Sequence, residues 1–381
     1  MTAHDPHSVG RNAKPFLHGP EYAAVTEALR IGQWGHNTAT DAFETELADF
    51  LGVPDVVAVS SCTAALHLSL LLAGVGPGHE VIVPSQTFCA TIQAILMSGA
   101  EPRFIDINAD TLCVDSAAVL AAITPQTRAV MPVLYGGRPI SLADIHATLD
   151  RRGIAVIEDA AHAFGSRLDS RKVGATGELT CFSFGPIKAL TCGEGGALIP
   201  RTADEADRAR TLRLLGVPQS QAARIRTTSY AVDTQGWRYH LSAVHAAIGR
   251  VQLARFATVE TTRRNLWRTY VQQLAGIDRV ALVDVDVERS VPFNCVVRIP
   301  VGRDRVFENL RDKGIGVGVH YPPNHLQPAF ARWSRPLPVT ETTARQVMSL
   351  PFHPDMTEDD VAHVVSMLAR AVTSSRADGD R

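Results

Sequence analysis

The feature that most constrains the fold of this chain is the alternation of short β-branched runs with helical stretches between Val53 and Pro200. Parallel strands need long crossover connections, which are usually helices and nearly always right-handed. The alternation therefore predicts an α/β fold with a mostly parallel sheet covered on both faces. Ligands of such sheets bind beyond the carboxyl ends of the strands, so we expect the chemistry there. The predicted strands are Glu80–Pro84, Pro102–Ile107, Arg128–Leu134, Ile154–Glu158, Thr180–Phe184 and Gly196–Pro200, and the predicted helices are Ala64–Ala73, Cys89–Ser98 and Leu142–Arg152.

The pattern changes after the sheet region. Ser242–Leu274 is rich in helix formers and contains no proline, which predicts a long helix that joins two domains, with a break near Thr258–Thr262. We therefore predict a large domain over residues 14–250, a small α+β domain over 251–372 and a disordered tail over 373–381. The predicted elements of the small domain are the strands Pro292–Ile299 and Val317–His320 and the helices Arg303–Lys313 and Glu358–Val372.

Composition excludes several classes of function. Of 381 residues, 45% are hydrophobic and 20% charged, and a net charge of -2 gives no general attraction to nucleic acid or anionic membranes. No stretch reaches the roughly 18 unbroken apolar residues of a membrane-spanning helix, and the N-terminal segment lacks the apolar core of a secretory signal. The six cysteines form no CxxC pair and no zinc-like spacing with histidine. We expect a cytoplasmic protein with reduced thiols and no metal, nucleic-acid or membrane partner.

Three small polar residues, Ser61, Cys62 and Thr63, lead from a short apolar run into a predicted helix. The first N–H groups of a helix lack internal partners and lie at the positive end of its dipole, so they can hold a phosphate. The same residue types also cap helices that bind nothing. Taken alone, this motif fits an ordinary cap better than a phosphate site.

Asp159 lies where a hydrophobic strand is predicted to end. A carboxylate at that edge can pair with a cationic ring nitrogen and keep a pyridine ring protonated, or it can cap the next turn. His162, three residues later, can contact an oxygen on such a ring, or it can be a structural histidine. The motif by itself leaves these alternatives open.

Lys188 follows the predicted Thr180–Phe184 strand in a loop rich in glycine and proline. A partly desolvated lysine has a lowered pKa, so its neutral amine can attack a carbonyl. Enzymes that use pyridoxal phosphate (PLP) need such a lysine for a Schiff base, and an aspartate against the ring nitrogen. A lone loop lysine is usually solvated, so this interpretation depends on the three motifs occurring together in this order.

Nine segments of the chain together match the pattern of one known family. They are SSCTAALHLSL (60–70), VIVPSQTFCAT (81–91), PRFIDI (102–107), IEDAAHAFGS (157–166), CFSFGPIKALTCGEGGAL (181–198), HLSAVHAAIGRVQL (240–253), VGVHYP (317–322), HLQPAF (325–330) and MSLPFHPDMTEDDV (348–361). With them the chain resembles the DegT/DnrJ/EryC1/StrS family, the sugar aminotransferases of fold type I, from about Lys14 to Arg370. The resemblance implies a large PLP-binding domain with a mostly parallel sheet, a small α+β C-terminal domain, and a homodimer whose active sites lie at the subunit interface.

The resemblance implies roles for individual residues. Lys188 matches the lysine that is joined to the cofactor, and Asp159 matches the partner of the pyridine nitrogen. Phe88 matches the aromatic side chain that stacks on the ring, although core packing is its usual alternative. His162 falls near the ring hydroxyl. The phosphate-binding positions are matched by Cys62, Thr63 and Ser183.

Two positions depart from the family pattern. Arg238 stands where the family commonly has an asparagine that reaches the cofactor phosphate from the neighbouring subunit, and Gly185 stands where it often has histidine or tyrosine. Arg238 can be a charge-assisted donor to that phosphate or to a phosphate of the substrate, or it can be a surface arginine. The candidates for the wall of the substrate pocket are Trp34, His320 and Tyr321.

Residues and resemblance together predict a PLP-dependent aminotransferase, with pyridoxamine phosphate as the alternate form of the cofactor. We expect glutamate or glutamine as the amino donor and a keto-sugar, first of all a nucleotide-linked keto-deoxysugar, as the acceptor. The alternatives are a keto-cyclitol aminotransferase and a non-catalytic PLP-binding regulator or sensor. Lys188 argues against the family's dehydratases, which have histidine in its place. Lys188 together with Asp159 and Ser183 also disfavours a sensor.

Overall fold

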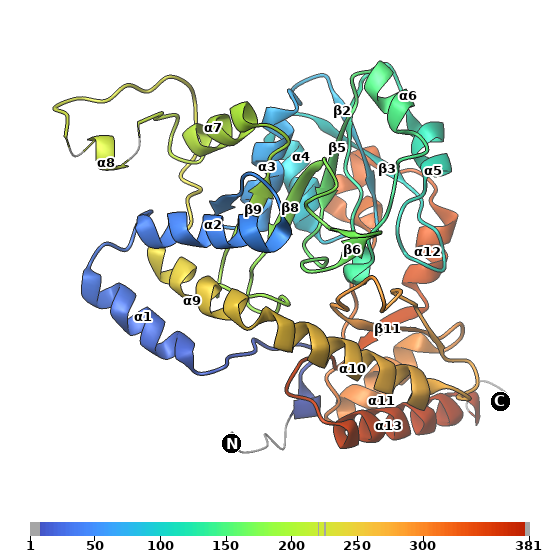
Figure 1. Cartoon of the computed structure of the whole chain (residues 1–381). Helices are drawn as coiled ribbons and strands as arrows, with labels where there is room; N and C mark the ends of the chain where they lie inside the picture. Colours follow the sequence, from blue (N-terminus) through green and yellow to red (C-terminus); the bar gives the residue numbers. More distant parts are fainter. Residues whose placement is uncertain (1–7, 220, 225, 378–381) are drawn as a thin grey trace.

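The structure is a computed structural model, and it describes residues 8–219, 221–224 and 226–377 (Figure 1). A seven-stranded sheet forms its centre, with the strand order β1-β9-β8-β5-β4-β2-β3. All neighbouring strands are parallel except β9, which runs antiparallel to both β1 and β8. The predicted fold class is therefore confirmed. The strands are β1 (Val57–Val59), β2 (Glu80–Pro84), β3 (Glu101–Ile105), β4 (Thr127–Val130), β5 (Ala155–Asp159), β8 (Leu179–Ser183) and β9 (Gly196–Ile199).

Helices cover both faces of this sheet because successive side chains of its strands point to opposite faces and both sets are apolar. Val57 and Val59 pack on one face with α3 (Cys62–Leu72), α4 (Cys89–Met97) and α7 (Ala203–Leu212). Ala58, between them, faces a second core with α2 (Thr38–Leu51) and α9 (Ala243–Ala254). The remaining part of that second face is covered by α5 (Ser116–Ala122) and α6 (His146–Arg151).

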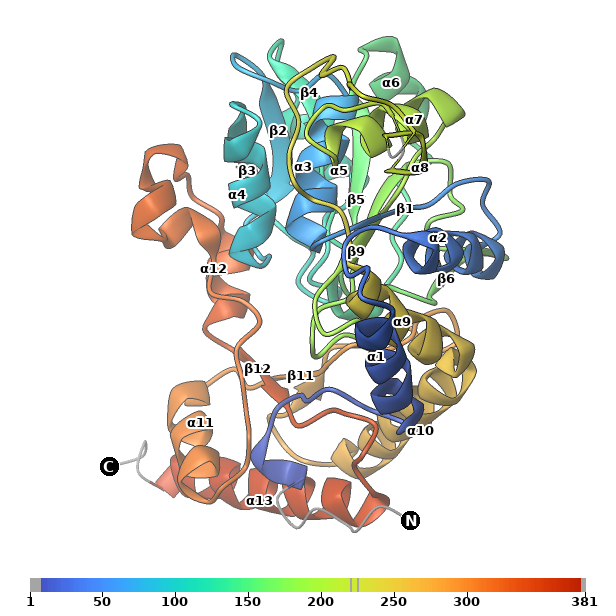
Figure 2. The same ribbon diagram turned by 90° about the vertical axis from the view of Figure 1, so that its left-hand side faces the viewer.

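The small domain lies at the end of the molecule away from the large sheet, where α10, α11 and α13 lie together in both views (Figures 1 and 2). They share one apolar core with an antiparallel three-stranded sheet of order β10-β11-β12. The N-terminal segment joins this domain, because Phe352 N–H donates to Asn12 O at 2.8 Å. The elements are α10 (Phe256–Leu274), β10 (Ala281–Leu282), β11 (Cys295–Arg298), α11 (Arg303–Asp312), β12 (Val347–Leu350) and α13 (Glu358–Ala377).

Part of the C-terminal segment returns to the large domain. Phe330 and Leu337 pack in the same core as α3 and α4, and Thr340 donates to Asp106 after the end of β3. The predicted division at residue 250 stays a prediction. These contacts show that the segment around residues 330–340, although predicted to belong to the small domain, packs on the large domain. The remaining elements are α1 (Pro20–Ile31), α8 (Gln221–Arg224), α12 (Pro338–Ala344), the short hairpin β6 (Arg167–Leu168) and β7 (Arg171–Lys172), and the 3-10 turns η1 (Ser8–Gly10), η2 (Tyr135–Gly137), η3 (Asn324–Leu326) and η4 (Pro328–Trp333).

Several predicted boundaries were wrong. The strand predicted to run to Leu134 ends at Val130, and the long helix breaks at Arg255 rather than near Thr258–Thr262. Val317–His320 is not a strand, because it makes only one bridge, between Gly318 and Ser349, before the chain crosses to the large domain. The strands that pair with β11 are β10 and β12, and the sequence analysis missed both.

The predicted tail overlaps a helix. Residues 373–377 belong to α13, and residues 378–381 lie outside the described residues. None of the described helices is both long enough and apolar enough to span a bilayer. The six cysteines are all unpaired thiols.

Candidate active site

A cavity of about 480 Å³ lies where the parallel strands β1, β2, β5 and β8 end. This is the edge at which ligands of open α/β sheets bind. Every residue predicted for the site lines this cavity except Trp34 and Arg238. The lining residues among those predicted are Ser61, Cys62, Thr63, Phe88, Asp159, His162, Ser183, Lys188, His320 and Tyr321.

The start of α3 forms one end of the cavity. Ser61 is the N-cap of this helix, and its hydroxyl accepts a hydrogen bond from Ala64 N–H at 3.1 Å. The N–H groups of Cys62 and Thr63 have no partner among the described residues. Ser61 therefore caps the helix through Ala64 N–H and still leaves two N–H groups that can bind an anion. Gly196 allows β9 to lie against this turn, because a Cβ there would be 2.6 Å from Cys62 N.

Asp159 is the last residue of β5 and is buried. Its Oδ2 accepts a hydrogen bond from the Thr91 hydroxyl at 2.7 Å, and its Oδ1 accepts one from Ala161 N–H at 3.2 Å. Burial raises the pKa of the Asp159 carboxyl, while these two donors act in the opposite direction. The carboxylate is therefore held in one orientation at the floor of the cavity.

Lys188 reaches the cavity from the loop after β8. Its Nζ lies 4.4 Å from the centre of the Phe293 ring, and it has no hydrogen bond or ion pair with any residue that the structure describes. Burial lowers the pKa of Lys188 to about 8. About a tenth of the amine is therefore uncharged at pH 7, and this neutral form is the one that attacks a carbonyl.

His162 is held from both ring nitrogens. Gly136 N–H donates to Nδ1 at 3.3 Å, so the proton of the neutral ring lies on Nε2, which is 3.0 Å from the Tyr321 hydroxyl. The ring also stacks on Phe293 at 3.9 Å between centroids, and burial holds its pKa well below the usual value. His162 thus meets the cavity as a neutral group already bonded to Tyr321.

Two further predicted residues form the wall of the cavity. The Phe88 side chain is 56% exposed and its ring lies 5.5 Å from that of Tyr321, so it is not a core residue in this chain. His320 shares a hydrogen bond of 2.8 Å with Ser349, and burial lowers its pKa to about 4. The imidazole of His320 is therefore neutral at physiological pH.

Comparison with known proteins identifies the chain. The model of the DegT/DnrJ/EryC1/StrS aminotransferase family matches residues 17–369. The chain belongs to this family. The predicted family is confirmed.

Solved structures of aminotransferases are similar over nearly the whole chain. Aminotransferase TlmJ from Streptoalloteichus hindustanus is 34% identical, with 96% of this chain and 99% of that chain covered and a TM-score of 0.89. Sugar aminotransferase CalS13 from Micromonospora echinospora is 30% identical, with 94% and 99% covered and a TM-score of 0.87. DesI, solved in the presence of its TDP-sugar product, is 31% identical, with 98% and 94% covered and a TM-score of 0.87.

The chain is thus a PLP-dependent aminotransferase of fold type I, related to enzymes of sugar transamination. One similar protein has been solved in both a PLP form and a PMP form. The cavity of this DegT/DnrJ/EryC1/StrS aminotransferase fits such a cofactor, which needs a phosphate cradle, an amine and a carboxylate. The open N–H groups of Cys62 and Thr63, the amine of Lys188 and the carboxylate of Asp159 provide these groups around one space.

Trp34 and Arg238 lie outside the cavity of their own chain. The Trp34 side chain is 56% exposed, and its indole N–H donates to Leu29 O at 3.2 Å. Arg238 lines a separate cavity of about 460 Å³, and its guanidinium bonds to none of the described side chains. Its proposed contact with a cofactor phosphate therefore requires a second subunit. The other basic side chains of this second cavity are His36, Arg224 and His240.

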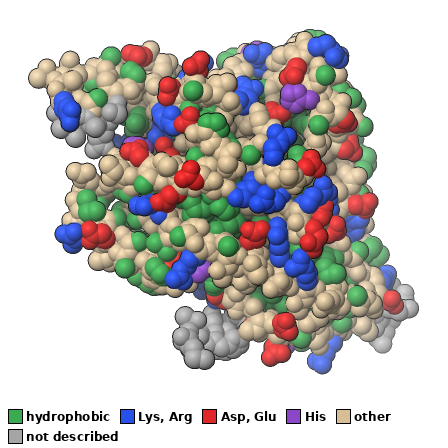
Figure 3. Space-filling view, viewed as in Figure 1, with side chains coloured by type: hydrophobic (Ala, Val, Ile, Leu, Met, Phe, Trp, Pro, Cys, Tyr) green, Lys and Arg blue, Asp and Glu red, His purple; other side chains and the backbone are tan. Residues whose placement is uncertain are grey.

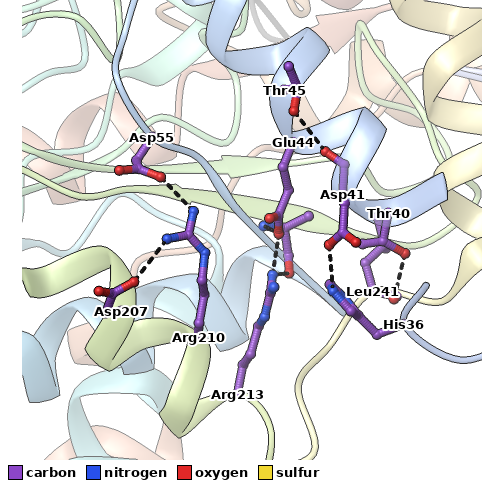
Figure 4. A network of polar contacts seen from close by, with 11 residues as sticks. His36, Thr40, Asp41, Glu44, Thr45, Asp55, Asp207, Arg210, Arg213 and Leu241 are labelled. Carbon is purple, nitrogen blue, oxygen red and sulfur yellow. Dashed lines mark hydrogen bonds and ion pairs between the residues drawn. The ribbon is translucent and has the colours of Figure 1, made fainter. Parts of the chain in front are cut away.

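Arg238 lies at the base of an arm that carries α8 and projects from the body (Figure 1). A buried ion pair anchors this base, since Arg213, just after α7, bonds both Glu44 of α2 and the carbonyl of Ala58 in β1 (Figure 4). Arg210 adds bonds to Asp55 and Asp207. The arm therefore leaves from a fixed point on the large domain.

Gly185 leaves open space in this member of the family. A Cβ on Gly185 would lie 3.7 Å from Ser183 Oγ and 3.9 Å from Glu194 Oε2, which are ordinary contacts. The backbone there does not require glycine, so its effect is to leave Ser183 and Glu194 uncovered. Glu194 lines the cavity and was missed by the sequence analysis.

Three more residues near the site were also missed. Thr87 and Thr91 follow β2 and stand four positions apart, a spacing of about one helical turn that also occurs in many helices without a ligand. Phe293, by contrast, reaches the site from the segment between β10 and β11, and no pattern in the sequence indicates this. Among the described residues, no group of three or more His, Cys, Asp or Glu side chains is placed to hold a metal ion.

Proposed function

We propose that this sugar aminotransferase moves an amino group from glutamate or glutamine to a nucleotide-linked keto-deoxysugar. The observation that best supports the reaction is the buried amine of Lys188, which has no polar partner in the described chain and shares a cavity with the Asp159 carboxylate. The TDP-sugar product of DesI supports the choice of acceptor class.

In this proposal PLP supplies an electron sink for the carbon that carries the amino group. With PLP bound, Lys188 Nζ would act as the base that takes the proton from the donor's α-carbon and later returns it. Asp159 keeps the ring nitrogen protonated, while the N–H groups of Cys62 and Thr63 hold the phosphate together with the Ser183 hydroxyl. The neutral amine that proton transfer needs is available because burial lowers the pKa of Lys188 to about 8.

The remaining predicted residues surround the ring and the substrate. Phe88 is proposed to stack on one ring face, because its side chain projects into the cavity rather than into the core. His162 is proposed to act near the ring hydroxyl together with Tyr321, to which it is bonded. His320 and Tyr321 then form the substrate wall, and both come from the segment that returns from the small domain.

We also propose a cytoplasmic homodimer in which Arg238 and Trp34 complete the site of the partner. The support is that neither residue reaches the cavity of its own chain. A further cavity, of about 720 Å³, lies between α1, α2 and α9, and hydrophobic side chains gather on this face of the molecule (Figure 3). A second copy is the proposed occupant. The unpaired thiols fit a reducing compartment.

An absorbance spectrum tests the reaction. The protein with PLP should show the band of the lysine-bound cofactor, and glutamate or glutamine should convert it to the band of the PMP form. Lys188→Ala should retain no transamination and no lysine-bound band. A wild-type rate in Lys188→Ala would rule out the mechanism.

The acceptor is tested on the protein in its PMP form. Return of the lysine-bound band with a TDP-linked keto-deoxysugar, and not with a keto-cyclitol, supports the proposal. Return with the cyclitol alone would favour the cyclitol aminotransferase. A lysine-bound band that no amino donor changes would favour the regulator or sensor.

A further inference from the structure

Two threonine hydroxyls form a chain that ends on Asp159. Thr91 Oγ1 donates to Asp159 Oδ2 at 2.7 Å, and Thr87 Oγ1 lies 2.8 Å from Thr91 Oγ1. Both threonines are 1% exposed, so water does not compete for these bonds. An ionised carboxylate can only accept hydrogen bonds, so the one hydroxyl proton of Thr91 is donated to Asp159. The proton between the two threonines must then come from Thr87, which gives the chain one direction.

The backbone holds this chain in place. Thr91 lies in the first turn of α4, and Thr87 lies in the loop just before Phe88, the N-cap of this helix. The Asn324 side chain, from the segment that returns from the small domain, donates to the carbonyl oxygens of Ser85 at 3.0 Å and Thr87 at 2.7 Å. The loop that carries Thr87 is thus tied to both halves of the molecule.

The carboxylate needs this support because burial disfavours its charge. Ala161 N–H satisfies part of Oδ1, and Thr91 satisfies part of Oδ2. Each carboxylate oxygen has two lone-pair sites, so room remains for a ring N–H. A hydrogen bond from a hydroxyl to an ionised group is stronger than one between neutral groups.

We propose that Thr91, oriented by Thr87, is a positioning residue that keeps Asp159 negatively charged and thereby keeps the ring nitrogen of the cofactor protonated. This inference rests on the proposed role of Asp159. Thr91 does not itself touch the ring in this account. It acts through Oδ2 of Asp159, and Thr87 acts through Thr91.

The test uses the full-length protein loaded with PLP that carries ¹⁵N in the ring. The ¹⁵N chemical shift reports protonation of the ring nitrogen, and quenching of protein fluorescence reports the Kd of PLP. Thr91→Val removes the hydroxyl at nearly constant shape. We expect the ring nitrogen to lose its proton about one pH unit lower than in the wild type, and PLP to bind roughly tenfold more weakly.

Matched variants separate positioning from packing. Thr91→Ser keeps the hydroxyl and should restore the wild-type shift. Thr87→Val removes only the outer donor and should move the titration in the same direction by less. Thr343→Val is the control, because Thr343 is also a buried helical threonine but donates to the Val339 carbonyl rather than to a carboxylate.

The outcomes are distinct. Unchanged ring titration in Thr91→Val, with an altered titration in Asp159→Asn, overturns the role of Thr91 and leaves that of Asp159. Unchanged titration in both variants overturns the role of Asp159 itself. If Thr91→Val does not fold, Thr87→Val decides the question, since a titration equal to that of the wild type there contradicts the hydroxyl chain.

Discussion

At the scale of single residues, the chemistry of this aminotransferase depends on charged groups that are removed from water. Burial lowers the pKa of Lys188 and raises that of Asp159, so each change favours the neutral form. Asp159 accepts two hydrogen bonds that oppose this effect, whereas Lys188 Nζ has no hydrogen-bond acceptor or ion-pair partner in the described chain. The same environment therefore leaves one group supported in its charged form and the other free to react as a neutral amine.

This difference predicts how capture of the cofactor depends on pH. Protonated Lys188 cannot attack PLP, so the rate at which apoprotein captures PLP should rise about tenfold per pH unit below the pKa of about 8 and then level off. Stopped-flow absorbance measures this rate. A small-molecule lysine analogue in water has the ordinary pKa of 10.5, so its rate of reaction with PLP should continue to rise above pH 8. The same continued rise in the protein would show that Lys188 is not desolvated.

At the scale of elements, the proposed phosphate cradle depends on how closely β9 approaches the start of α3. Val59 of β1 pairs with Gly196 of β9, and α3 begins three residues after Val59. A Cβ on Gly196 would lie 2.6 Å from both Cys62 N and Ser61 C, closer than real contacts allow. The open N–H groups therefore require glycine at this one position of the strand.

Gly196→Ala should push the strand and the helix apart. We expect a loss of about 1 to 3 kcal/mol in the free energy of unfolding, measured by urea denaturation, together with weaker binding of PLP. Gly185→Ala is the control, because its Cβ would meet no atom closer than 3.7 Å and its stability should stay near that of the wild type. Equal stability of Gly196→Ala and the wild type would show that the backbone shifts at little cost.

At the scale of the whole molecule, the site combines segments that are far apart in the chain. The bond between His162 and Tyr321 joins residues separated by 159 positions, and that between Ser85 and His325 joins residues separated by 240. The small domain therefore contributes to the wall of a cavity whose floor belongs to the large sheet. A further contribution, from Arg238 and Trp34 of a second copy of the chain, is proposed.

Mixed dimers test that contribution. If Arg238 acts in the partner's site, a dimer of one Lys188→Ala chain and one Arg238→Ala chain has one site with both defects and one intact site. Co-expression should therefore restore activity at about a quarter of all sites, although each parent alone is impaired. The control pairs Lys188→Ala with Asp159→Asn, which act in the same chain's cavity and leave no intact site. No gain over the parents in the first pair would contradict the shared site.

Much of the fold and of the reactive centre could be predicted from the sequence. The strand–helix alternation predicts the sheet, and β2 begins and ends where predicted. Asp159 was predicted at the ligand-binding edge because it follows a predicted strand, whereas Ser183 was assigned to the phosphate only by resemblance to the family. In the structure both residues end parallel strands, so they meet at one edge of the sheet.

The prediction of a strand at Val317–His320 was wrong. After one bridge at Gly318 the chain crosses to the large domain, where the His320 carbonyl accepts hydrogen bonds from Gln86 and Tyr135. Local propensity does not encode such tertiary contacts.

The sequence by itself determined the fold class and the family, and it predicted Lys188 as the reactive lysine and Asp159 as the carboxylate, because these follow from local patterns and from motifs in a fixed order. Only the tertiary structure decided that Thr91 supports Asp159 across 68 residues, that Phe293 lies under Lys188, and that Tyr321 holds His162. Such contacts depend on how separate segments pack after the chain has folded. A local sequence pattern contains no information on which distant side chain will fill the neighbouring space.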